Sequence, residues 1–352
     1  MSEPATPYLR VDVARLRRNI AGTAERAAAA GVALRPHVKT HKCVEIARLQ
    51  LDVGAIGITV ATIGEAEVFA QHGVDDIFVA YPLWLTDEAA VRLRAIAEVA
   101  QVAIGVDSAE AATRAASLLA GSGVEALVEV DSGHHRSGIQ ASAAGALAVA
   151  AEEAGLPVRG VFTFPGHSYA PDALVSSAED ESRALSEATA SLRDAGLEPD
   201  VLSGGSTPSL AHADTGLLTE LRPGVYVFGD AQQWELGTTR PDHIALTCRA
   251  TVVSHAGGRL VLDSGSKALG ADRASYSTGW GRLPAHPDAR IVLLSEHHAV
   301  VDLAGAPLLP LGSRVDVVPN HVCNAVNLTD TMWADDGGPL VPWSVAARGR
   351  NA

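Results

Sequence analysis

The spacing of hydrophobic and polar positions predicts a repeating strand–helix pattern over residues 32–230. Short runs of apolar residues alternate there with longer segments whose apolar residues recur at helical spacing. After a first strand that leads to Lys39, strands are expected at Ile56–Val60, Ile77–Ala80, Val102–Val106, Ala126–Val130, Val158–Thr163, Val201–Ser203 and Val225–Phe228. Eight strands that alternate with helices predict a (β/α)8 TIM barrel rather than a doubly wound sheet.

The pattern changes after Asp230, where five short β-type runs are separated by Gly, Pro and Asp turns. The runs are Thr247–Val253, Arg259–Leu262, Ala289–Leu294, Ala299–Leu303 and Arg314–Val318. Without a long helical pattern between them, they predict an all-β domain. We expect a barrel domain over residues 12–238, whose first helix is capped by Asp12, and a β domain over residues 239–352. A short N-terminal strand at residues 6–11 is expected to join the β domain.

Composition excludes several classes of function. The chain has 352 residues and a formal net charge of −14, with no basic block, which argues against a nucleic-acid or membrane-surface partner. Its three cysteines, Cys43, Cys248 and Cys323, are odd in number and widely spaced. This is no disulfide framework, so a reducing, cytoplasmic setting is expected. No secretion signal and no membrane-spanning apolar run is apparent.

One stretch reverses the acidic balance locally. Arg35–Lys42 (RPHVKTHK) holds five basic residues among eight, and an anionic ligand is the simplest reason. Lys39 follows the first predicted strand, and the carboxyl ends of barrel strands form the active-site face of such folds. A lysine at that position can form a Schiff base with a carbonyl compound. For a lone lysine, however, an ordinary basic loop is the more common explanation.

Glycines and hydroxyl side chains follow the seventh predicted strand. Successive glycines let backbone N–H groups turn toward an anion, and phosphate sites of barrel enzymes often lie after strands seven and eight. Tyr226, one strand later, can supply a further donor. A plain turn is the alternative, but the position favours a phosphate site formed by Ser203, Gly204, Gly205, Ser206 and Thr207.

Two more polar clusters end the fifth and sixth predicted strands. Arg136 lies in the segment VDSGHHRSG and can pair with an oxyanion. His167 and Tyr169, in GHSY, add an imidazole and a phenol. Each cluster alone is as typical of a surface loop. Together they predict that polar side chains gather at the same end of successive strands.

A candidate metal site lies in the predicted β domain. His321 and Cys323 are two residues apart, and on an extended strand such residues face the same side. An imidazole and a thiolate suit zinc, and two protein ligands leave positions free for water or substrate. A lone His-x-Cys is nevertheless more often part of ordinary packing. The pair His297 and His298 offers additional acid/base groups.

Taken together, RPHVKTHK, VDSGHHRSG, GHSY, SGGSTP, PGVYVFGD and PNHVCNAVNL resemble the D-serine dehydratase / D-threonine aldolase family. The resemblance covers nearly the whole chain. It implies an alanine-racemase-like barrel and a C-terminal β domain, the fold type III of pyridoxal-phosphate enzymes. It also implies that Lys39 is the Schiff-base lysine, that His321 and Cys323 bind a divalent metal facing a β-hydroxyl, and that His298 is a catalytic base. The implied cofactor-binding residues are Arg136, His167, Tyr169, the loop Ser203–Thr207 and Tyr226.

The resemblance further implies a substrate and a reaction. The expected substrate is a small β-hydroxy D-amino acid, and the expected reaction is loss of water to give a 2-oxo acid and ammonia. The alternative is aldol cleavage to glycine and an aldehyde. Aldolases of this family typically carry Asp where Cys323 stands, and a thiolate favours zinc over manganese or magnesium. An amino-acid racemase and a non-catalytic pyridoxal-phosphate carrier remain as further readings, and a homodimer is implied.

Overall fold

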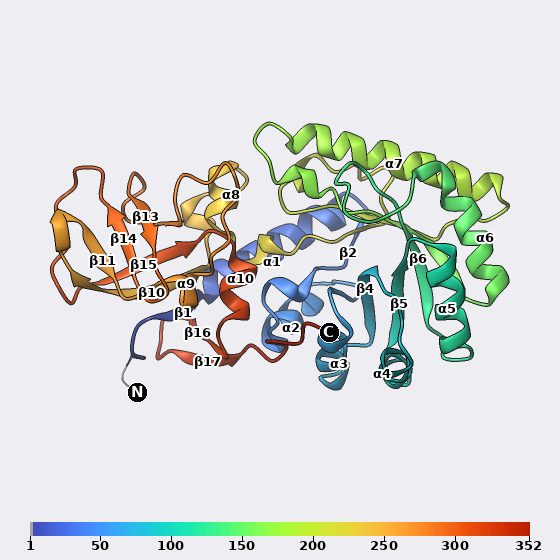
Figure 1. The fold of residues 1–352 in the computed structure, drawn as a ribbon, viewed down its shortest axis with the longest axis horizontal. Coiled ribbons are helices and arrows are strands. Elements are labelled where there is room, and N and C mark those ends of the chain that lie inside the picture. Colours follow the sequence, from blue (N-terminus) through green and yellow to red (C-terminus); the bar gives the residue numbers. More distant parts are fainter. Residues whose placement is uncertain (1–2) are drawn as a thin grey trace. The chain divides into compact units, whose positions relative to one another are not determined.

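The structure is a computed structural model that describes residues 3–352 and divides into two compact units. The barrel unit contains Thr23–Lys39, Gln50–Gly224 and Arg350–Ala352, and the β unit contains residues 3–22, Thr40–Leu49 and Val225–Gly349. Figure 1 shows the strands and helices of both units in sequence colours. The chain changes units within two helices, α1 (Val13–Ala29) and α2 (Val44–Asp52).

The barrel unit contains eight parallel strands. Their hydrogen-bonded order is β2-β9-β8-β7-β6-β5-β4-β3. The two ends of this order are joined, because His37 and Thr59 form a parallel bridge and Ile56 N–H donates to the Leu34 carbonyl at 2.9 Å. The predicted (β/α)8 barrel is therefore confirmed. The strands are β2 (Ala33–Leu34), β3 (Ile58–Val60), β4 (Asp76–Pro82), β5 (Gln101–Val106), β6 (Glu125–Glu129), β7 (Val158–Phe162), β8 (Val201–Gly204) and β9 (Glu220–Leu221).

Helices follow the strands and lie outside them (Figure 1). Three begin with a hydroxyl side chain that accepts a backbone N–H of the first turn: Thr62, Thr86 and Ser108. The hydrophobic spacing predicts one helix over Asp87–Ala97, which are the observed bounds of α4, and another from Ala178, four residues after the observed start of α7. The helices are α3 (Ile63–Gln71), α4 (Asp87–Ala97), α5 (Ala109–Leu119), α6 (Ala144–Ala154) and α7 (Leu174–Asp194).

The predicted eighth strand was wrong. Val225–Val227 forms a 3₁₀ turn, and the eighth barrel strand is β9, only two residues long. Val225, Tyr226 and Phe228 are apolar or aromatic because they are buried in the core of the β unit. A short buried apolar run has the same pattern whether it is a strand or a packed turn.

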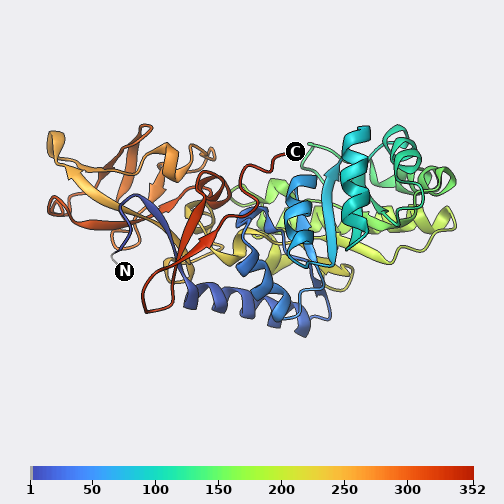
Figure 2. The same cartoon turned by 90° about the horizontal axis from the view of Figure 1, so that it is seen from below.

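The β unit holds a nine-stranded, mostly antiparallel sheet. Its main order is β13-β14-β11-β10-β1-β16-β17, and β15 pairs with both β10 and β12. In Figure 2 the blue β1 runs beside the red strands near the C-terminus, in agreement with its parallel pairing to β16. The strands are β1 (Tyr8–Asp12), β10 (Leu246–Ser254), β11 (Leu260–Leu262), β12 (Gly281–Arg282), β13 (Arg290–Leu294), β14 (Ala299–Asp302), β15 (Arg314–Pro319), β16 (Thr331–Asp335) and β17 (Val341–Ser344).

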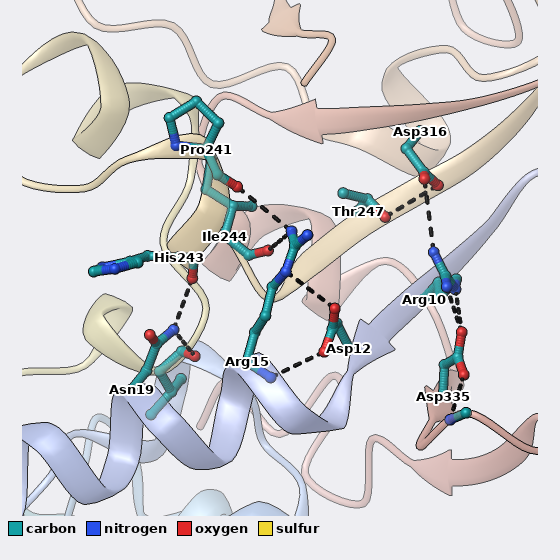
Figure 3. A network of polar contacts seen from close by, with 12 residues as sticks. Arg10, Asp12, Arg15, Asn19, Pro241, His243, Ile244, Thr247, Asp316 and Asp335 are labelled. Carbon is teal, nitrogen blue, oxygen red and sulfur yellow. Dashed lines mark hydrogen bonds and ion pairs between the residues drawn. The ribbon is translucent and has the colours of Figure 1, made fainter. Parts of the chain in front are cut away.

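Polar contacts bind residues 10–19 to the rest of the β unit (Figure 3). Arg10 on β1 pairs with Asp335 and lies 3.6 Å from Asp316. Asp12 caps α1 as predicted, since its carboxylate accepts the Arg15 N–H at 2.9 Å. Asn19 donates its amide to the carbonyls of Val227 and His243. These contacts explain why an N-terminal strand and half a helix fold with residues 225–349.

Three short helices complete the β unit. They are α8 (Ala231–Glu235), α9 (Ser266–Leu269) and α10 (Val322–Asn327). In the described part of the chain, no helix is long and apolar enough to cross a membrane.

Candidate functional site

Lys39 lies in a 3₁₀ turn, Val38–Thr40, that follows β2 in the barrel unit. Its Nζ lies 5.6 Å from the centre of the Phe164 ring, and the Arg136 guanidinium lies 5.3 Å from the same ring. The rings of His134 and Tyr169 are 5.6 and 6.4 Å from it. Phe164, just after β7, therefore gathers the predicted residues Lys39, Arg136 and Tyr169 around one aromatic side chain.

Arg35 does not serve an anionic ligand, contrary to the expectation from the sequence. Its guanidinium is buried and donates to Glu220 at 2.8 Å and to both oxygens of Asp76 at 2.6 and 3.0 Å. Burial alone would lower the pKa of Arg35, but these two carboxylates raise it above its ordinary value. Gly57 leaves the space that the guanidinium fills, because a Cβ there would lie 2.5 Å from Arg35 Nη1. Arg35 is thus a structural cation.

His37 is a neutral residue among cations. Burial first, then the charges of Lys39 and Arg222, lower its pKa well below the ordinary value. Its Nδ1 is buried and has no hydrogen-bond partner among residues 3–352. The imidazole therefore adds no positive charge to a region that already holds Lys39, Arg136 and Arg222.

Arg222 is a deeply buried arginine that the sequence did not single out. Its Nε donates to the Ser203 hydroxyl at 2.7 Å, and its guanidinium also bonds the Thr163 carbonyl and covers the Phe162 ring. Burial lowers the pKa of Arg222, and Glu220 is the largest opposing influence. The Ser203 hydroxyl in turn donates to Glu220 at 2.7 Å, so it is already used within the barrel.

The segment after β6 that carries Arg136 is held by Asp131. This carboxylate accepts the N–H groups of Gly133 and His135 and bonds the His135 ring at 2.7 Å. Arg136 is exposed, which leaves its guanidinium accessible. Arg136 is therefore an accessible cation on a turn that Asp131 fixes at the mouth of the barrel.

His167 and Tyr169 lie in and after a 3₁₀ turn, Gly166–Ser168. His167 Nε2 is 3.2 Å from the Asp180 carboxylate, while its buried Nδ1 has no partner among the described residues. Gly133 packs against this ring, since a Cβ there would lie 3.3 Å from His167. The structure thus joins His167 to the Arg136 segment, as the sequence predicted for residues at successive strand ends.

The glycine–serine loop follows β8, the seventh barrel strand, as predicted. Gly205 has φ +82°, a conformation that favours glycine. Ser206 is buried, and its hydroxyl lies 2.8 Å from those of Ser168 and Ser209. Hydroxyl groups in such a cluster can each donate or accept, so the loop presents adaptable donors beside glycine backbone.

Glu181 lies against this loop from helix α7. It is 1% exposed, and its Oε1 accepts the Gly205 N–H at 2.7 Å. Its Oε2 is buried without a partner among the described residues. Burial raises the pKa of Glu181 from 4.5 to about 7, against the opposing effects of the Gly205 N–H and Arg222.

This raised pKa predicts how stability depends on pH. Between pH 4.5 and 7 the folded protein keeps a proton on Glu181 that the unfolded chain has released, so folding stability falls as pH rises. Relative to Glu181→Gln, the wild type should lose about 2–3 kcal/mol of unfolding free energy between pH 5 and pH 8. Denaturant titrations of both proteins at several pH values measure this difference.

The matched control is Glu187→Gln, because Glu187 is an exposed glutamate on the same helix. This variant tests whether the loss of any glutamate from α7 changes the pH curve. Parallel pH curves for wild type and Glu181→Gln would show that Glu181 titrates normally.

The β unit brings His321 and Cys323 together, although not as predicted. His321 is extended, but Cys323 lies in the first turn of α10, so the strand-alternation argument was wrong. Their side chains still interact. The Cys323 thiol donates to the Thr40 hydroxyl at 3.3 Å. A sharp change from strand to helix, rather than a pleat, makes the pair converge.

Asp230 supports this pair. It is fully buried, and its Oδ2 lies 3.4 Å from His321 Nδ1 and accepts the Val322 N–H at 3.2 Å. Oδ1 caps α8 by accepting the Gln233 N–H at 2.8 Å. Burial would lower the pKa of His321, but the Cys323 sulfur and Asp230 raise it well above the ordinary value.

Two other predicted residues have different surroundings. Tyr226 is buried in the core of the β unit. His298 is exposed in the turn between β13 and β14, and its carbonyl accepts the Ser295 N–H at 2.8 Å. No hydrogen bond or ion pair of the His298 ring occurs within residues 3–352, so the structure does not join it to His321 or Cys323.

Comparison with known proteins identifies the family. Residues 11–232, more than half of the chain, match the family described as alanine racemase, N-terminal domain. The chain belongs to the alanine racemase-like fold-type III family. Residues 245–334 match a putative serine dehydratase domain, which confirms the resemblance drawn from the sequence motifs.

Members of the family with known names are similar along nearly the whole chain. D-threo-3-hydroxyaspartate dehydratase from Delftia sp. (strain HT23) is 35% identical over 348 residues, covering 90% of each chain. D-threonine aldolase from Arthrobacter sp. is 31% identical and covers 98% of this chain and 93% of its own. The solved structure of the Delftia dehydratase has a TM-score of 0.89 and covers 97% of both chains at 32% identity.

The alanine racemase-like fold-type III family depends on pyridoxal phosphate, and the residues of the barrel unit fit that cofactor. Lys39 offers an amine beside the accessible cation Arg136. The loop after β8 offers a left-handed glycine and a cluster of hydroxyl groups. The cofactor has a carbonyl group, a phenolate and a phosphate. The Lys39 amine suits the carbonyl group, the Arg136 cation suits the phenolate, and the glycine–serine loop suits the phosphate.

The β unit fits a divalent metal with two protein ligands. Within residues 3–352, no group of three or more His, Cys, Asp or Glu side chains is arranged to hold a metal ion. His321 and Cys323 supply an imidazole and a thiol, which are typical zinc ligands. Such a set needs further ligands from water or substrate, which is the arrangement of a catalytic rather than a structural ion.

Sequence reasoning missed Phe164, Glu181 and Asp230. Phe164 lies within the segment TFPGHSY, next to the residues that were selected. Asp230 ends the motif PGVYVFGD, where the strand–helix pattern of the sequence stops. Glu181 has no local signal, because it is one acidic residue among several on an amphipathic helix.

Proposed function

We propose that this protein is a pyridoxal-phosphate- and metal-dependent lyase that removes water from small β-hydroxy D-amino acids. The observation that carries the proposal is the His321–Cys323 pair, which lies within a domain that matches a putative serine dehydratase. The similarity to D-threo-3-hydroxyaspartate dehydratase supports the same reaction class.

Solved structures of D-threo-3-hydroxyaspartate dehydratase support the metal ligands. They include one variant with a histidine replaced by alanine and another, in a metal-free form, with a cysteine two positions later replaced by alanine. His321 and Cys323 have the same spacing here. The proposal therefore assigns these two residues to metal binding.

The barrel residues take the following roles in the proposal. Lys39 Nζ holds the cofactor and accepts the proton from the α-carbon of the substrate. Arg136 pairs with the cofactor's phenolic oxygen, Ser206 and Thr207 hold its phosphate, and His37 stays neutral. Pyridoxal phosphate, when bound, supplies an electron sink for the charge left on the α-carbon.

The residues of the β unit decide the fate of the β-hydroxyl. His321 and Cys323 hold the metal, and the buried Asp230 orients His321. A divalent metal at that position supplies Lewis-acid polarisation of a hydroxyl oxygen. In aldol cleavage, His298 would serve as the base that takes the proton of the β-hydroxyl group.

Aldol cleavage is the second candidate, because D-threonine aldolase is 31% identical along almost the entire chain. The same metal ligands can serve either reaction. The thiol of Cys323 favours dehydration, since aldolases of this family typically carry an aspartate at that position. Zinc is the preferred metal for an imidazole–thiolate pair.

Product analysis tests the proposal. The purified protein, supplied with pyridoxal phosphate and zinc, is incubated with D-serine, D-threonine and 3-hydroxy-D-aspartate. We expect a 2-oxo acid and ammonia in equal amounts from at least one of them. Chromatography of the reaction mixture separates these products from glycine, aldehydes and the L-amino acids.

The outcomes are distinguishable. Glycine with an aldehyde would establish the aldolase, and formation of the L-isomer would establish a racemase. Protein that binds the cofactor but turns over none of the three substrates, nor a wider set of D-amino acids, would contradict the lyase assignment. The same substrates with Lys39→Ala provide the blank.

A further inference from the structure

The loop that follows β8 is held in place by a carboxyl group that no sequence motif contains. Glu181 reaches Gly205 from α7, across 24 positions of sequence, and accepts its N–H at 2.7 Å. The loop is held on its other side by backbone, since Arg222 N–H donates to the Gly204 carbonyl at 2.8 Å. Gly204 and Gly205 are thus fixed between a helix and a strand end.

The fit between Glu181 and the loop is close. A Cβ on Gly204 would lie 2.5 Å from Glu181 Oε1 and 2.9 Å from Leu218, so only glycine fits there. Gly205, at φ +82°, would place a Cβ 2.9 Å from Leu221. Packing against Glu181 and Leu218 therefore requires glycine at position 204, and packing against Leu221 requires it at position 205.

The hydrogen bond to Glu181 also determines which hydrogen-bond donors of the loop are available to a ligand. The Gly205 N–H is used by Glu181, and the Ser206 N–H lies 3.3 Å from the Ser209 hydroxyl. The Ser206 hydroxyl is shared with Ser168 and Ser209, whose groups can rotate. The serine hydroxyls, rather than the Gly205 N–H, are consequently the adaptable donors of the loop.

We propose that Glu181 is a positioning residue that holds the Gly204–Ser209 loop in its phosphate-binding conformation. This inference rests on the proposed function, because the phosphate belongs to the proposed cofactor. Without an acceptor at position 181, the Gly205 N–H is buried and unsatisfied, at a cost that the loop can avoid by moving. Movement of Gly205 displaces Ser206, its neighbour in the loop.

The charge state of Glu181 gives the proposal a second consequence. The cation that faces it is Arg222, which opposes the effect of burial, and no other charged side chain within residues 3–352 shifts the pKa of Glu181. Below pH 7 the carboxyl group is largely neutral, and above pH 7 it is an anion beside the loop. An anion there opposes a phosphate group, so cofactor affinity should fall as Glu181 ionises.

The test compares two ligands and two variants. Dissociation constants of pyridoxal phosphate and of pyridoxal, which lacks the phosphate, are measured by absorbance titration of apoprotein. Glu181→Leu should weaken pyridoxal phosphate about tenfold or more, because it leaves a buried N–H unpaired, and should leave pyridoxal within about twofold. Glu181→Gln keeps a carbonyl acceptor and should bind pyridoxal phosphate nearly as well as wild type at pH 6.

The pH profile separates positioning from a merely structural role. Between pH 6 and pH 8.5, the ratio of the wild-type dissociation constant to that of Glu181→Gln should rise about threefold or more. Glu187→Leu is the matched control, because Glu187 is exposed on the same helix, and it should leave the dissociation constants of both ligands unchanged. Circular dichroism and thermal unfolding establish that each variant is folded.

Each result decides the proposal. Equal weakening of pyridoxal and pyridoxal phosphate by Glu181→Leu, or no weakening of either, would overturn it. If Glu181→Leu does not fold, the Glu181→Gln pH ratio decides instead, and a constant ratio overturns the proposal. A wild type that binds neither ligand would contradict the proposed function itself, which distinguishes the two failures.

Discussion

Replacing Lys39 by alanine should give a colourless protein with no measurable lyase activity. Lys39 is the amine beside Arg136 and Phe164 at the barrel mouth. In the proposed function it binds the cofactor covalently and also accepts the proton from the α-carbon of the substrate. Loss of a group with two such roles should lower kcat on the order of 10³-fold or more. Absorbance of the purified protein and a steady-state assay measure the two effects.

The chain allows an unusually clear assignment of the reactive amine, because it contains only three lysines, Lys39, Lys42 and Lys267. Reduction of the cofactor-loaded protein with borohydride should label one peptide, the one that contains Lys39. Lys267→Ala is the control, since Lys267 is exposed and pairs with Glu296. A label on Lys42, or a yellow Lys39→Ala protein, would refute the assignment.

Replacing His321 or Cys323 by alanine should remove lyase activity and leave the yellow colour. These residues lie in the β unit, whereas Lys39 and the glycine–serine loop lie in the barrel unit, so the two cofactors can be lost separately. Lewis-acid polarisation is typically worth several kcal/mol, so activity should fall on the order of 10²-fold or more. Metal analysis should show less bound zinc in both variants.

Chelation of the wild type should reproduce this result, and added zinc should restore activity to the wild type alone. His243→Ala is the control, because His243 is an exposed histidine in the same unit. Full activity in protein that metal analysis shows to be metal-free would contradict the role of His321 and Cys323. Cobalt substitution offers a spectroscopic check, since a cobalt–thiolate absorbance should be absent from Cys323→Ala.

Local pattern was enough to predict most of the barrel. Strands and helices that are buried on one side have strong periodicity, and α4 was predicted to the residue. The prediction failed where pattern and structure are not uniquely related. Val225–Phe228 is apolar because it packs as a turn, and the two-residue β9 is too short to have a pattern.

The candidate site was predictable where its residues lie in strand-end segments. Lys39, Arg136 and Tyr169 were identified from their positions, and the structure gathers them around Phe164. Arg35 was misread because only tertiary structure reveals its partners, Asp76 and Glu220. Glu181 was invisible for the same reason, since its contact with Gly205 depends on how α7 packs on the barrel.

The ion pair between Arg35 and Glu220 has a consequence for the order in which parts of the barrel fold. The two residues are 185 positions apart, and β2 pairs with β9 across a similar interval. At roughly 5–20 residues per second, the ribosome needs about 10–40 s to make that interval. During this time β2 lacks its β9 neighbour, and Glu220, one of the two carboxylates that neutralise Arg35, has not yet been synthesised. The high contact order of this seam makes its closure a late folding step, so the turn that carries Lys39 is completed only when the last barrel strand has emerged.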